Sequence, residues 1–359
     1  MFLFSFFAIS NTVKADDVSS NISSLTVSPS NVSDGGKTTV RFTFDEHAQK
    51  IKSGDTINVT WQNSGTVYGS GFSKQISLEI QGKHVGDMVI TDGEARVTFN
   101  DNIEGLQNIT GWGEFEIQAR NLTDTTEEHT GTFVINGGGQ STTVSVTKGK
   151  SGTSSVFYYK TGDMLTTDTD HVRWFLNINN DKVYVSDVVR IEDEIQSGQT
   201  LDMSSFYITV TGQRNENYYG DDALTKFSND FPGSVIYADA TTGKISVYIP
   251  QQWVSLNSIS IMYLTKVENP NQKTFENNSK AWYQEYNKEA VNGKDFNFSV
   301  ANVRADGGAD GNRTTTTEST TESTTTTTES TTEPTTTTTE STTESTTTTT
   351  ESTTESTTT

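Results

Sequence analysis

The feature that most constrains the fold of this chain is the alternation of apolar and polar residues in many short segments. The pattern appears in TTVRFTF and DTINVTW and recurs, with interruptions, as far as DFNFSV. Side chains of a β-strand point alternately to its two faces, so a period of two predicts strands with one buried and one exposed face. Turn signals such as SDGGK and INGGGQ separate the segments. Helical periodicity is sparse, and 221–231 is the best candidate for a short helix.

Changes in composition divide the chain into regions. A short linker, KGKSGTSS, separates two strand-rich regions, 16–149 and 150–301. The length and pattern of each region are typical of a domain made of two packed sheets. We therefore expect an all-β protein with two immunoglobulin-like Greek-key β-sandwich domains. After Arg313 the chain contains threonine, serine, glutamate and one proline, without apolar residues to build a core. We therefore expect 313–359 to be a disordered Thr/Ser/Glu-rich stalk.

The N-terminus predicts export. Its apolar run FLFSFFAI is too short to span a membrane, and the residues VKA, which end at Ala15, are typical of a cleavage site. We expect a signal peptide at 1–15, truncated at its start because the charged n-region is missing; a short buried strand is the alternative. Cysteine is absent, which excludes disulfides and thiolate metal sites. These features suit a secreted protein anchored in a Gram-positive cell wall, with the anchor motif outside this sequence.

Composition also argues against several classes of function. Lys and Arg number 25 against 46 Asp and Glu, a formal charge of −21, which disfavours nucleic acid and anionic lipid as partners. The four histidines are scattered without metal-ligand spacing, and the sequence contains neither a nucleophile elbow nor a nucleotide-binding loop. We expect no enzyme activity, no cofactor, no metal and no small-molecule substrate, and we expect a monomer.

Several long, ordered stretches carry a family resemblance. They are LTVSPSNVSDGGKTTV, GEFEIQARNLT, VFYYKTGDM, HVRWFLNINN, FENNSKAWYQE and VNGKDFNFSV. Together they resemble the collagen-binding cell-wall adhesins of Gram-positive cocci, over roughly residues 18–312. The resemblance implies two immunoglobulin-like domains on an anchored stalk, with the collagen triple helix bound in a trench on the second domain. It also implies that the domains close around the collagen rod and that a C-terminal latch then adds a strand to the first domain.

Two other classes of function stay open at this point. One is a binding module for another matrix protein, such as laminin or fibrinogen, that uses the same closing mechanism. The other is a structural stalk or pilus-type subunit. A pilus subunit needs no exposed aromatic face and usually carries an intermolecular lysine motif, which this sequence lacks.

Lys160 raises a specific question because it follows large apolar and aromatic residues in VFYYK and faces the side opposite to Tyr159. The resemblance implies that Lys160 forms an isopeptide bond with the side chain of Asn277, assisted by Asp193. Burial disfavours an ammonium, so Lys160 can become a neutral nucleophile, while a protonated Asp193 can polarise the Asn277 amide. By analogy with a disulfide closing roughly 120 residues, the bond would stabilise the domain by about 4–5 kcal/mol. A buried Lys–Asp ion pair is the alternative.

The first domain departs from the family pattern at two positions. Arg41 stands where the resemblance places a lysine, and Gly139 stands where it places the partner asparagine. Arginine stays protonated and cannot act as the amine. We therefore expect a single cross-link, in the second domain.

A collagen-binding face is expected on the second domain. Parity places Arg173, Phe175 and Asn177 on one face of their strand. Proline rings pack on aromatic side chains, and collagen carbonyls accept hydrogen bonds from amides and guanidinium groups. Tyr207 and Met262 stand where the family has asparagines, which makes this trench more apolar. The full set of residues expected to bind collagen is Val156, Tyr159, Leu165, Arg173, Phe175, Asn177, Tyr207, Tyr218 and Met262. The alternative is that the aromatic residues belong to the core.

The segment 302–312 is the expected latch, led by Asn302, Val303, Arg304, Ala305 and Asp306. Its residues are small and glycine-rich and alternate only weakly, so it cannot form a core alone. Such a strand can still join a sheet edge through backbone hydrogen bonds. A flexible spacer is the alternative.

Overall fold

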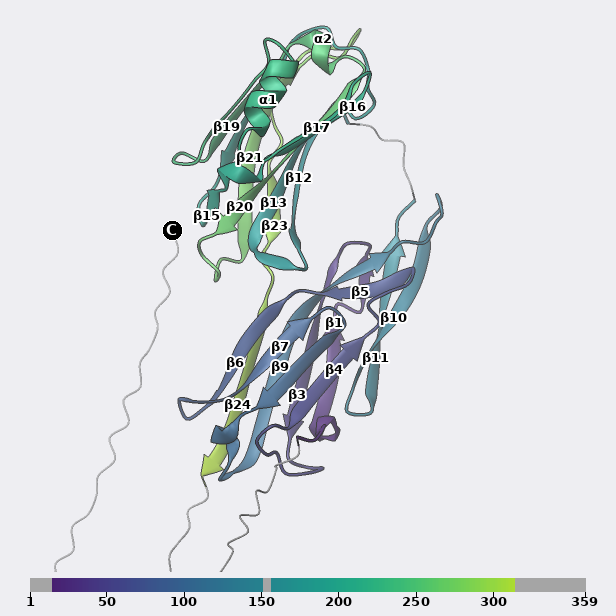
Figure 1. Ribbon diagram of the computed structural model, residues 1–359. Helices are drawn as coiled ribbons and strands as arrows, with labels where there is room; N and C mark the ends of the chain where they lie inside the picture. Colours follow the sequence, from purple (N-terminus) through teal and green to yellow (C-terminus); the bar gives the residue numbers. More distant parts are fainter. Residues whose placement is uncertain (1–14, 151–155, 314–359) are drawn as a thin grey trace, which may run out of the picture. The chain divides into compact units, whose positions relative to one another are not determined.

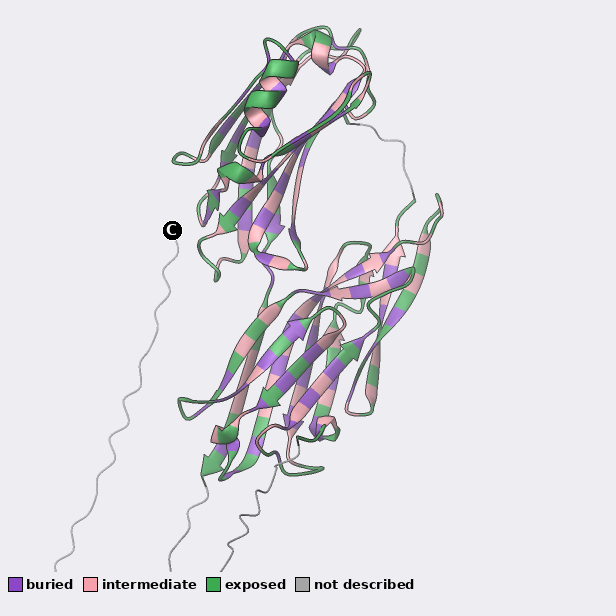
Figure 2. Cartoon of the chain, viewed as in Figure 1, coloured by how far each residue is buried: buried purple, intermediate pink, exposed green. Residues whose placement is uncertain are grey.

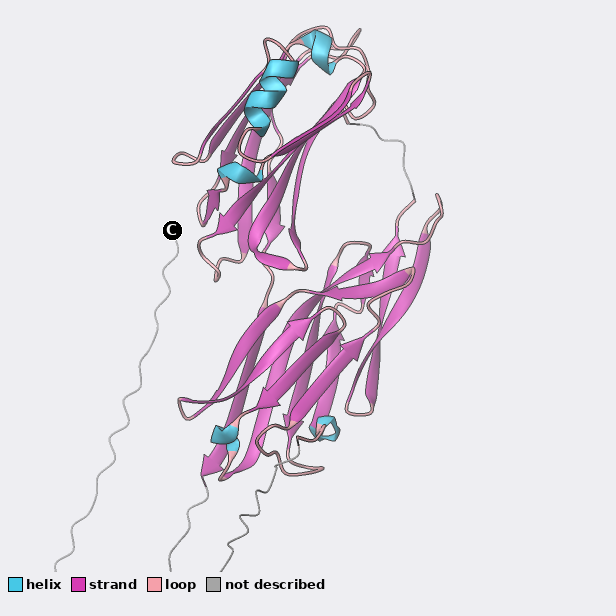
Figure 3. Cartoon of the chain, viewed as in Figure 1, coloured by secondary structure: helices cyan, strands magenta, loops and turns pink. Residues whose placement is uncertain are grey.

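The computed structural model describes residues 15–150 and 156–313 (Figure 1). The expected signal peptide before Ala15 and the stalk beyond Arg313 lie outside the described residues. Strands dominate the described chain, which confirms the all-β prediction (Figure 3). The candidate helix at 221–231 is also confirmed, as α1 (Ala223–Asp230). No helix in the described ranges is long and apolar enough to cross a membrane.

The N-terminal strands form a sandwich of two sheets. One sheet has the order β1 (Ile22–Ser28), β3 (Lys37–Asp45), β9 (Leu106–Asn121), β24 (Ala305–Arg313), and β5 (Val67–Gly71) also pairs with β9. The other has the order β2 (Asn31–Ser33), β11 (Gln140–Lys148), β10 (His129–Gly137), β4 (Thr56–Trp61), β8 (Glu94–Phe99), β7 (Lys83–Thr91), β6 (Lys74–Ile80). Short 3₁₀ turns lie at Ser19–Asn21 and Asp101–Ile103.

The later strands form a second sandwich. One sheet has the order β12 (Tyr158–Leu165), β13 (Asp168–Ile178), β20 (Asn257–Val267), β16 (Tyr207–Gly212), β17 (Asn215–Tyr219), and β15 (Gln199–Leu201) also pairs with β20. The other has the order β18 (Val235–Asp239), β19 (Lys244–Ile249), β14 (Val189–Ile195), β21 (Thr274–Tyr283), β22 (Val291–Asp295), and β23 (Phe298–Ala301) also pairs with β21. A 3₁₀ turn lies at Met203–Ser205, and α2 spans Gln251–Val254.

The period of two in the sequence becomes the core of each sandwich. Along β3, Val40, Phe42 and Phe44 are buried. Buried and exposed positions alternate in the same way along most strands of both sandwiches (Figure 2). Trp174 on β13 is fully buried in the second core. Burial of such large apolar side chains is the main favourable term in folding. Here it requires the two sheets of each sandwich to pack against each other.

One strand pairs far from its neighbours in sequence. β24 follows the last strand of the second sandwich but lies antiparallel to β9 of the first, with Ala305 opposite Phe115 and Asn312 opposite Gln107. This pairing extends the β1–β3–β9 sheet by one strand.

Candidate functional site

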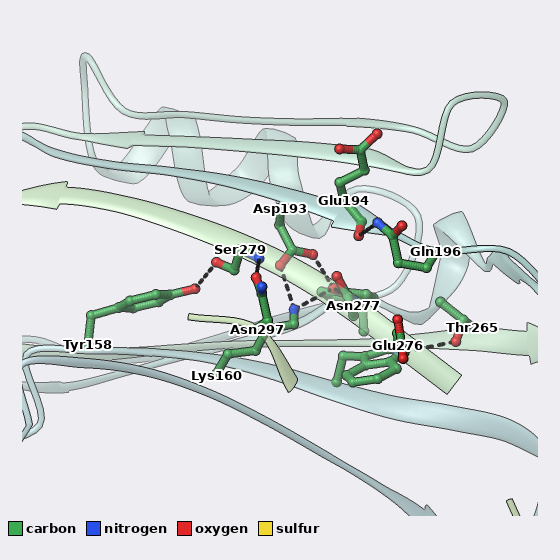
Figure 4. A network of polar contacts seen from close by, with 12 residues as sticks. Tyr158, Lys160, Asp193, Glu194, Gln196, Thr265, Glu276, Asn277, Ser279 and Asn297 are labelled. Atoms are coloured by element: carbon green, nitrogen blue, oxygen red, sulfur yellow. Dashed lines mark hydrogen bonds and ion pairs between the residues drawn. The ribbon is translucent and has the colours of Figure 1, made fainter. Parts of the chain in front are cut away.

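A buried polar cluster lies between the two sheets of the second sandwich (Figure 4). Lys160 comes from β12 and Tyr263 from β20 of one sheet. Asp193 comes from β14 and Asn277 from β21 of the other sheet. The sequence prediction that Lys160 faces the core is therefore confirmed, because the residue is buried while Tyr159 is exposed.

Hydrogen bonds join the four side chains. Lys160 Nζ lies 2.5 Å from Asp193 Oδ1 and 3.3 Å from the hydroxyl oxygen of Tyr263. The Tyr263 hydroxyl donates to Asp193 Oδ2, and Asn277 Nδ2 donates to the Tyr263 hydroxyl at 2.6 Å. The remaining amide atom, Asn277 Oδ1, is buried and has no hydrogen-bond partner among the described residues.

The surroundings of the cluster act on its protonation. Burial lowers the pKa of the Lys160 ammonium, although the charge of Asp193 and its hydrogen bond act in the opposite direction. Burial first, and then Asp193, raises the pKa of Tyr263 well above its usual value. The rings of Trp174 and Tyr263 lie 5.3 Å and 5.7 Å from Lys160 Nζ. Burial therefore makes it easier for Lys160 to lose its proton and keeps the Tyr263 phenol neutral beside the carboxamide.

The two first-domain positions do not form a comparable site. Arg41 is exposed on β3, where it pairs with Glu114 at 3.0 Å and lies 4.5 Å from the Trp112 ring. Gly139 lies at the turn between β10 and β11 with a φ of +77°. Arg41 therefore points away from the core, because Val40 and Phe42 occupy the core-facing positions beside it, and its place differs from the buried place of Lys160.

The outer face of the β12–β17 sheet carries two rows of side chains. Cross-strand pairing aligns one row as Thr161, Phe175, Met262, Tyr207 and Tyr219. It aligns the adjacent row as Tyr159, Asn177, Ser260, Thr209 and Asn217. We call these two rows the outer face. An aromatic and apolar row thus runs beside a largely polar row.

Several predicted residues are available on this outer face. Tyr159 and Tyr207 are 40% and 39% exposed, and the ring of Tyr207 stacks on that of Tyr219 with centroids 6.4 Å apart. Phe175 and Asn177 are half-buried. The alternative that the aromatic residues belong to the core is therefore wrong for Tyr159, Phe175 and Tyr207. Beyond the two rows, Val156 and Leu165 are also exposed.

Arg173 is placed differently from the expectation of a free guanidinium. Its Nε and Nη2 donate to the two carboxylate oxygens of Asp163 at 2.8 Å and 2.7 Å. The guanidinium also lies 5.0 Å from the centroid of the Phe175 ring. Arg173 therefore packs against Phe175, while its Nε and Nη2 donors are already engaged by the carboxylate of Asp163.

The assignment of Tyr218 to the binding face is wrong. Tyr218 is 6% exposed, its hydroxyl donates to Asp230 at 2.9 Å, and its ring packs edge-on against Phe227. Its neighbour Tyr219 is 69% exposed and lies opposite Tyr207. Adjacent residues of a strand face opposite sides, so only one tyrosine of the pair can reach the outer face. From the sequence, this rule could have shown that Tyr218 and Tyr219 face opposite sides. Which of the two faces outward depends on how β17 packs.

The expected latch divides into two parts. Asn302 and Val303 are buried, and Asn302 Nδ2 donates to the carbonyls of Pro270 and Gln272 at 2.9 Å each. These two residues are therefore held by the second sandwich, so placing them in the latch is wrong. The Arg304 backbone N–H donates to Glu116 of β9 at 3.1 Å, and the paired strand then begins at Ala305 and includes Asp306.

The residues of β24 that face the core of the first sandwich are all small, whereas most of those that face outward are polar. Ala305 and Ala309 pack against the core of the first sandwich. A Cβ added to Gly307 would lie 3.2 Å from Leu78 Cδ2, and one added to Gly311 would lie 3.4 Å from Ile80 Cδ1. The inward positions are therefore small because side chains of β6 already occupy the space. This pattern was missed in the sequence because alanine and glycine carry little hydropathy contrast.

Acidic side chains and histidines do not gather into a metal site in the part of the chain that the structure describes. No group of three or more of these side chains in the described ranges is placed to hold a metal ion. The polar cluster around Lys160 contributes a single carboxylate, that of Asp193.

Comparisons with known proteins agree with this architecture. A family model described as a collagen binding domain matches residues 155–292, and one described as a bacterial Ig domain matches 31–131. The collagen adhesin of Staphylococcus aureus is 53% identical over 298 residues, which are 83% of this chain and 25% of that protein. The chain thus spans about a quarter of the length of this relative.

Solved structures give the same result. The crystal structure of the S. aureus collagen adhesin matches with a TM-score of 0.78 and 51% identity, over 84% of this chain and 99% of that one. The collagen binding domain of Erysipelothrix rhusiopathiae surface protein RspB shares the fold, with a TM-score of 0.69 and 19% identity over 83% of this chain and 99% of that one. The expected immunoglobulin-like fold is confirmed, and this chain belongs to the collagen adhesin family.

Proposed function

We propose that this chain is the ligand-binding region of a bacterial surface adhesin that binds the collagen triple helix on the outer face. The observation that carries the proposal is the aromatic row through Phe175, Tyr207 and Tyr219 beside the polar row through Asn177 and Asn217. Proline rings of collagen pack on aromatic side chains, and its outward carbonyls need hydrogen-bond donors. The two rows supply both kinds of contact side by side.

Two amides of the polar row are oriented as donors. Ser260 Oγ hydrogen-bonds to Asn177 Oδ1 at 2.9 Å, and the Tyr207 hydroxyl donates to Asn217 Oδ1 at 3.2 Å. Each contact engages the acceptor end of the amide and favours presentation of its N–H groups to a ligand. Tyr207, which replaces an asparagine of the family, therefore contributes an aromatic surface and orients a neighbouring amide. This arrangement suits a ligand rich in carbonyl acceptors.

We also propose that β24 closes the chain around the bound rod. The strand makes backbone hydrogen bonds to β9 along most of its length, and its small inward residues fit beside β6. A segment held by backbone bonds and little buried apolar area can detach more readily than a core strand. Reversible pairing of β24 with β9 would therefore make β24 a latch. The strand would detach from β9 before a long rod is released.

We further propose that Lys160 and Asn277 form an isopeptide bond in the mature protein. The support is the burial of both residues and the shared hydrogen-bond network through Asp193 and Tyr263. The bond joins β12 to β21, which lie in different sheets of the sandwich. It would hold the binding sheet to its partner sheet without cysteine. The protein as a whole is proposed to be a non-enzymatic monomer, exported and anchored through its stalk.

Binding of the full chain to a panel of immobilised proteins tests the proposal. The panel contains triple-helical collagens, heat-denatured collagen, laminin and fibrinogen. We expect saturable binding to native collagen and little binding to denatured collagen, because the two rows cross five paired strands and a flexible chain would lose more conformational entropy than a rod on contacting all of them. Binding to laminin or fibrinogen with no binding to any collagen would show that the ligand is another matrix protein.

A further inference from the structure

Tyr263 contacts all three groups of the proposed cross-linking reaction. Its hydroxyl lies 3.3 Å from Lys160 Nζ and 2.6 Å from Asn277 Nδ2, and it donates to Asp193 Oδ2. The hydrogen bonds of Asp193 run to Lys160 and Tyr263, whereas the Asn277 amide bonds to Tyr263. The phenol is thus the link between the carboxyl group and the amide.

We propose that Tyr263 is a catalytic residue that relays a proton from Asp193 to the departing nitrogen of Asn277, an inference that rests on the cross-link proposed above. An amide nitrogen is a poor leaving group until it is protonated, and the donor must lie within hydrogen-bond reach. In this structure the group within reach of Asn277 Nδ2 is the Tyr263 hydroxyl.

The first steps create the nucleophile and the new bond. The Lys160 ammonium transfers a proton across 2.5 Å to Asp193, which leaves a neutral amine and a carboxylic acid. The amine lone pair then forms a bond to Cγ of Asn277, and the carbonyl π electrons move to Oδ1. The intermediate has a positive charge on the former lysine nitrogen and a negative charge on Oδ1.

The relay completes the reaction. Tyr263 gives its phenol proton to Nδ2 and takes a proton from the Asp193 carboxyl group, after a half-turn of that carboxyl group. The electrons on Oδ1 re-form the carbonyl, the Cγ–Nδ2 bond breaks and ammonia leaves. The Asp193 carboxylate then accepts the surplus proton from the new amide nitrogen. The products are a neutral amide, a carboxylic acid and ammonia, so charge and hydrogen atoms balance.

The environment of Tyr263 suits this role. Its hydroxyl is enclosed, and burial together with Asp193 raises its pKa, so the phenol keeps its proton until a stronger base appears beside it. In the intermediate, Nδ2 of Asn277 is an amine nitrogen and therefore such a base. In the starting state the same nitrogen belongs to a planar amide and is not basic. The relay therefore acts after the lysine has attacked.

The chain contains a matched control. Tyr158 lies on β12 and is also fully buried, but its hydroxyl bonds to Ser279 Oγ at 2.5 Å. Tyr158→Phe and Tyr263→Phe each remove one buried phenol hydroxyl from the same core. A difference between them in cross-linking rate therefore reports the position of the hydroxyl rather than its loss.

The experiment follows cross-linking of newly made full-length chain. Aliquots from a pulse of cell-free synthesis are quenched in denaturant, and intact mass gives the fraction that has lost ammonia. We expect Tyr263→Phe to slow this loss about 100-fold or more, the usual contribution of a positioned acid, with Tyr158→Phe close to the natural chain. A fluorinated tyrosine at 263, which is a stronger acid of nearly the same shape, is expected to speed the loss, and the same change at 158 is not.

The outcomes separate the two proposals. A natural chain that never loses ammonia would overturn the cross-link and the relay together. If the natural chain cross-links and Tyr263→Phe loses ammonia at the same rate, the relay alone is overturned. If Tyr263→Phe does not fold, the fluorotyrosine chains decide, because a rate that is indifferent to phenol acidity at 263 also overturns the relay.

Discussion

Lys160 Nζ lies 2.5 Å from Asp193 Oδ1, and neither side chain is exposed to solvent. An ion pair in such a place has a large desolvation cost that its attraction does not always offset. Neutralising the pair by proton transfer and then joining the amine to Asn277 removes the buried charges altogether. This buried contact is the physical reason to expect a covalent bond between Lys160 and Asn277.

Purified full-length protein is expected to weigh one ammonia less than its sequence mass. Lys160→Ala should restore the full mass because it removes the amine. Lys280→Ala is the control, since this lysine is exposed on the same sandwich and pairs loosely with Asp295 at 3.8 Å. Intact-mass spectrometry makes the measurement. A deficit of two ammonias would place a second cross-link elsewhere, and no deficit would leave Lys160 and Asp193 as a simple ion pair.

Truncating the aromatic residues of the outer face is expected to weaken collagen binding. Tyr159→Ala and Phe175→Ala should each cost about 2 kcal/mol, or about thirty-fold in Kd, with little change in melting temperature. Tyr248→Ala is the matched control, because Tyr248 is exposed on β19 in the other sheet of the same sandwich. Surface plasmon resonance and thermal melting check this. Normal affinity in the two outer-face variants would move the binding site elsewhere.

The neighbours Tyr218 and Tyr219 are expected to respond in opposite ways. Tyr219→Ala should reduce collagen binding and leave stability unchanged, because its ring is on the outer face. Tyr218→Ala should destabilise the fold by about 3–5 kcal/mol, as expected for truncation of a large buried aromatic residue. Denaturant unfolding combined with collagen binding distinguishes them. Equal losses of stability in both variants would contradict the packing of β17.

Removing β24 is expected to affect dissociation from collagen more than association. A chain that ends at Arg304 retains Asn302 and Val303, which the second sandwich holds, and lacks the strand from Ala305 onward. Its dissociation rate should rise by far more than its association rate falls, because the latch must open before release. The comparison is with a chain that ends at Arg313, on immobilised collagen.

A single substitution can test the same strand. Gly307→Val should mimic the truncation, since its added Cβ would already lie 3.2 Å from Leu78 Cδ2 and the branched side chain needs further space. Asp306→Val adds a branched side chain on the exposed face of β24 and is the control. Unchanged dissociation rates in both Gly307→Val and the truncated chain would show that β24 is a spacer.

Local sequence pattern determined the class of fold and several orientations. Alternation along a strand depends on backbone geometry alone, so the all-β class and the opposite facing of Tyr159 and Lys160 could be predicted. The same rule applied to β3 places Arg41 outside, because Val40 and Phe42 are the apolar residues of that strand. Alternation alone thus indicated that Arg41, unlike Lys160, does not face a core.

Tertiary structure decided how separate strands combine. The order of strands in the sheets brings Tyr263, which no local motif marks, between Asp193 and Asn277. Packing of β17 against α1 decides that Tyr218 turns inward and Tyr219 outward. The small residues of β24 make sense only beside β6, whose side chains fill the adjacent space. Alternation specifies which residues share a face, but which face is buried, and against what, depends on contacts between residues far apart in the chain.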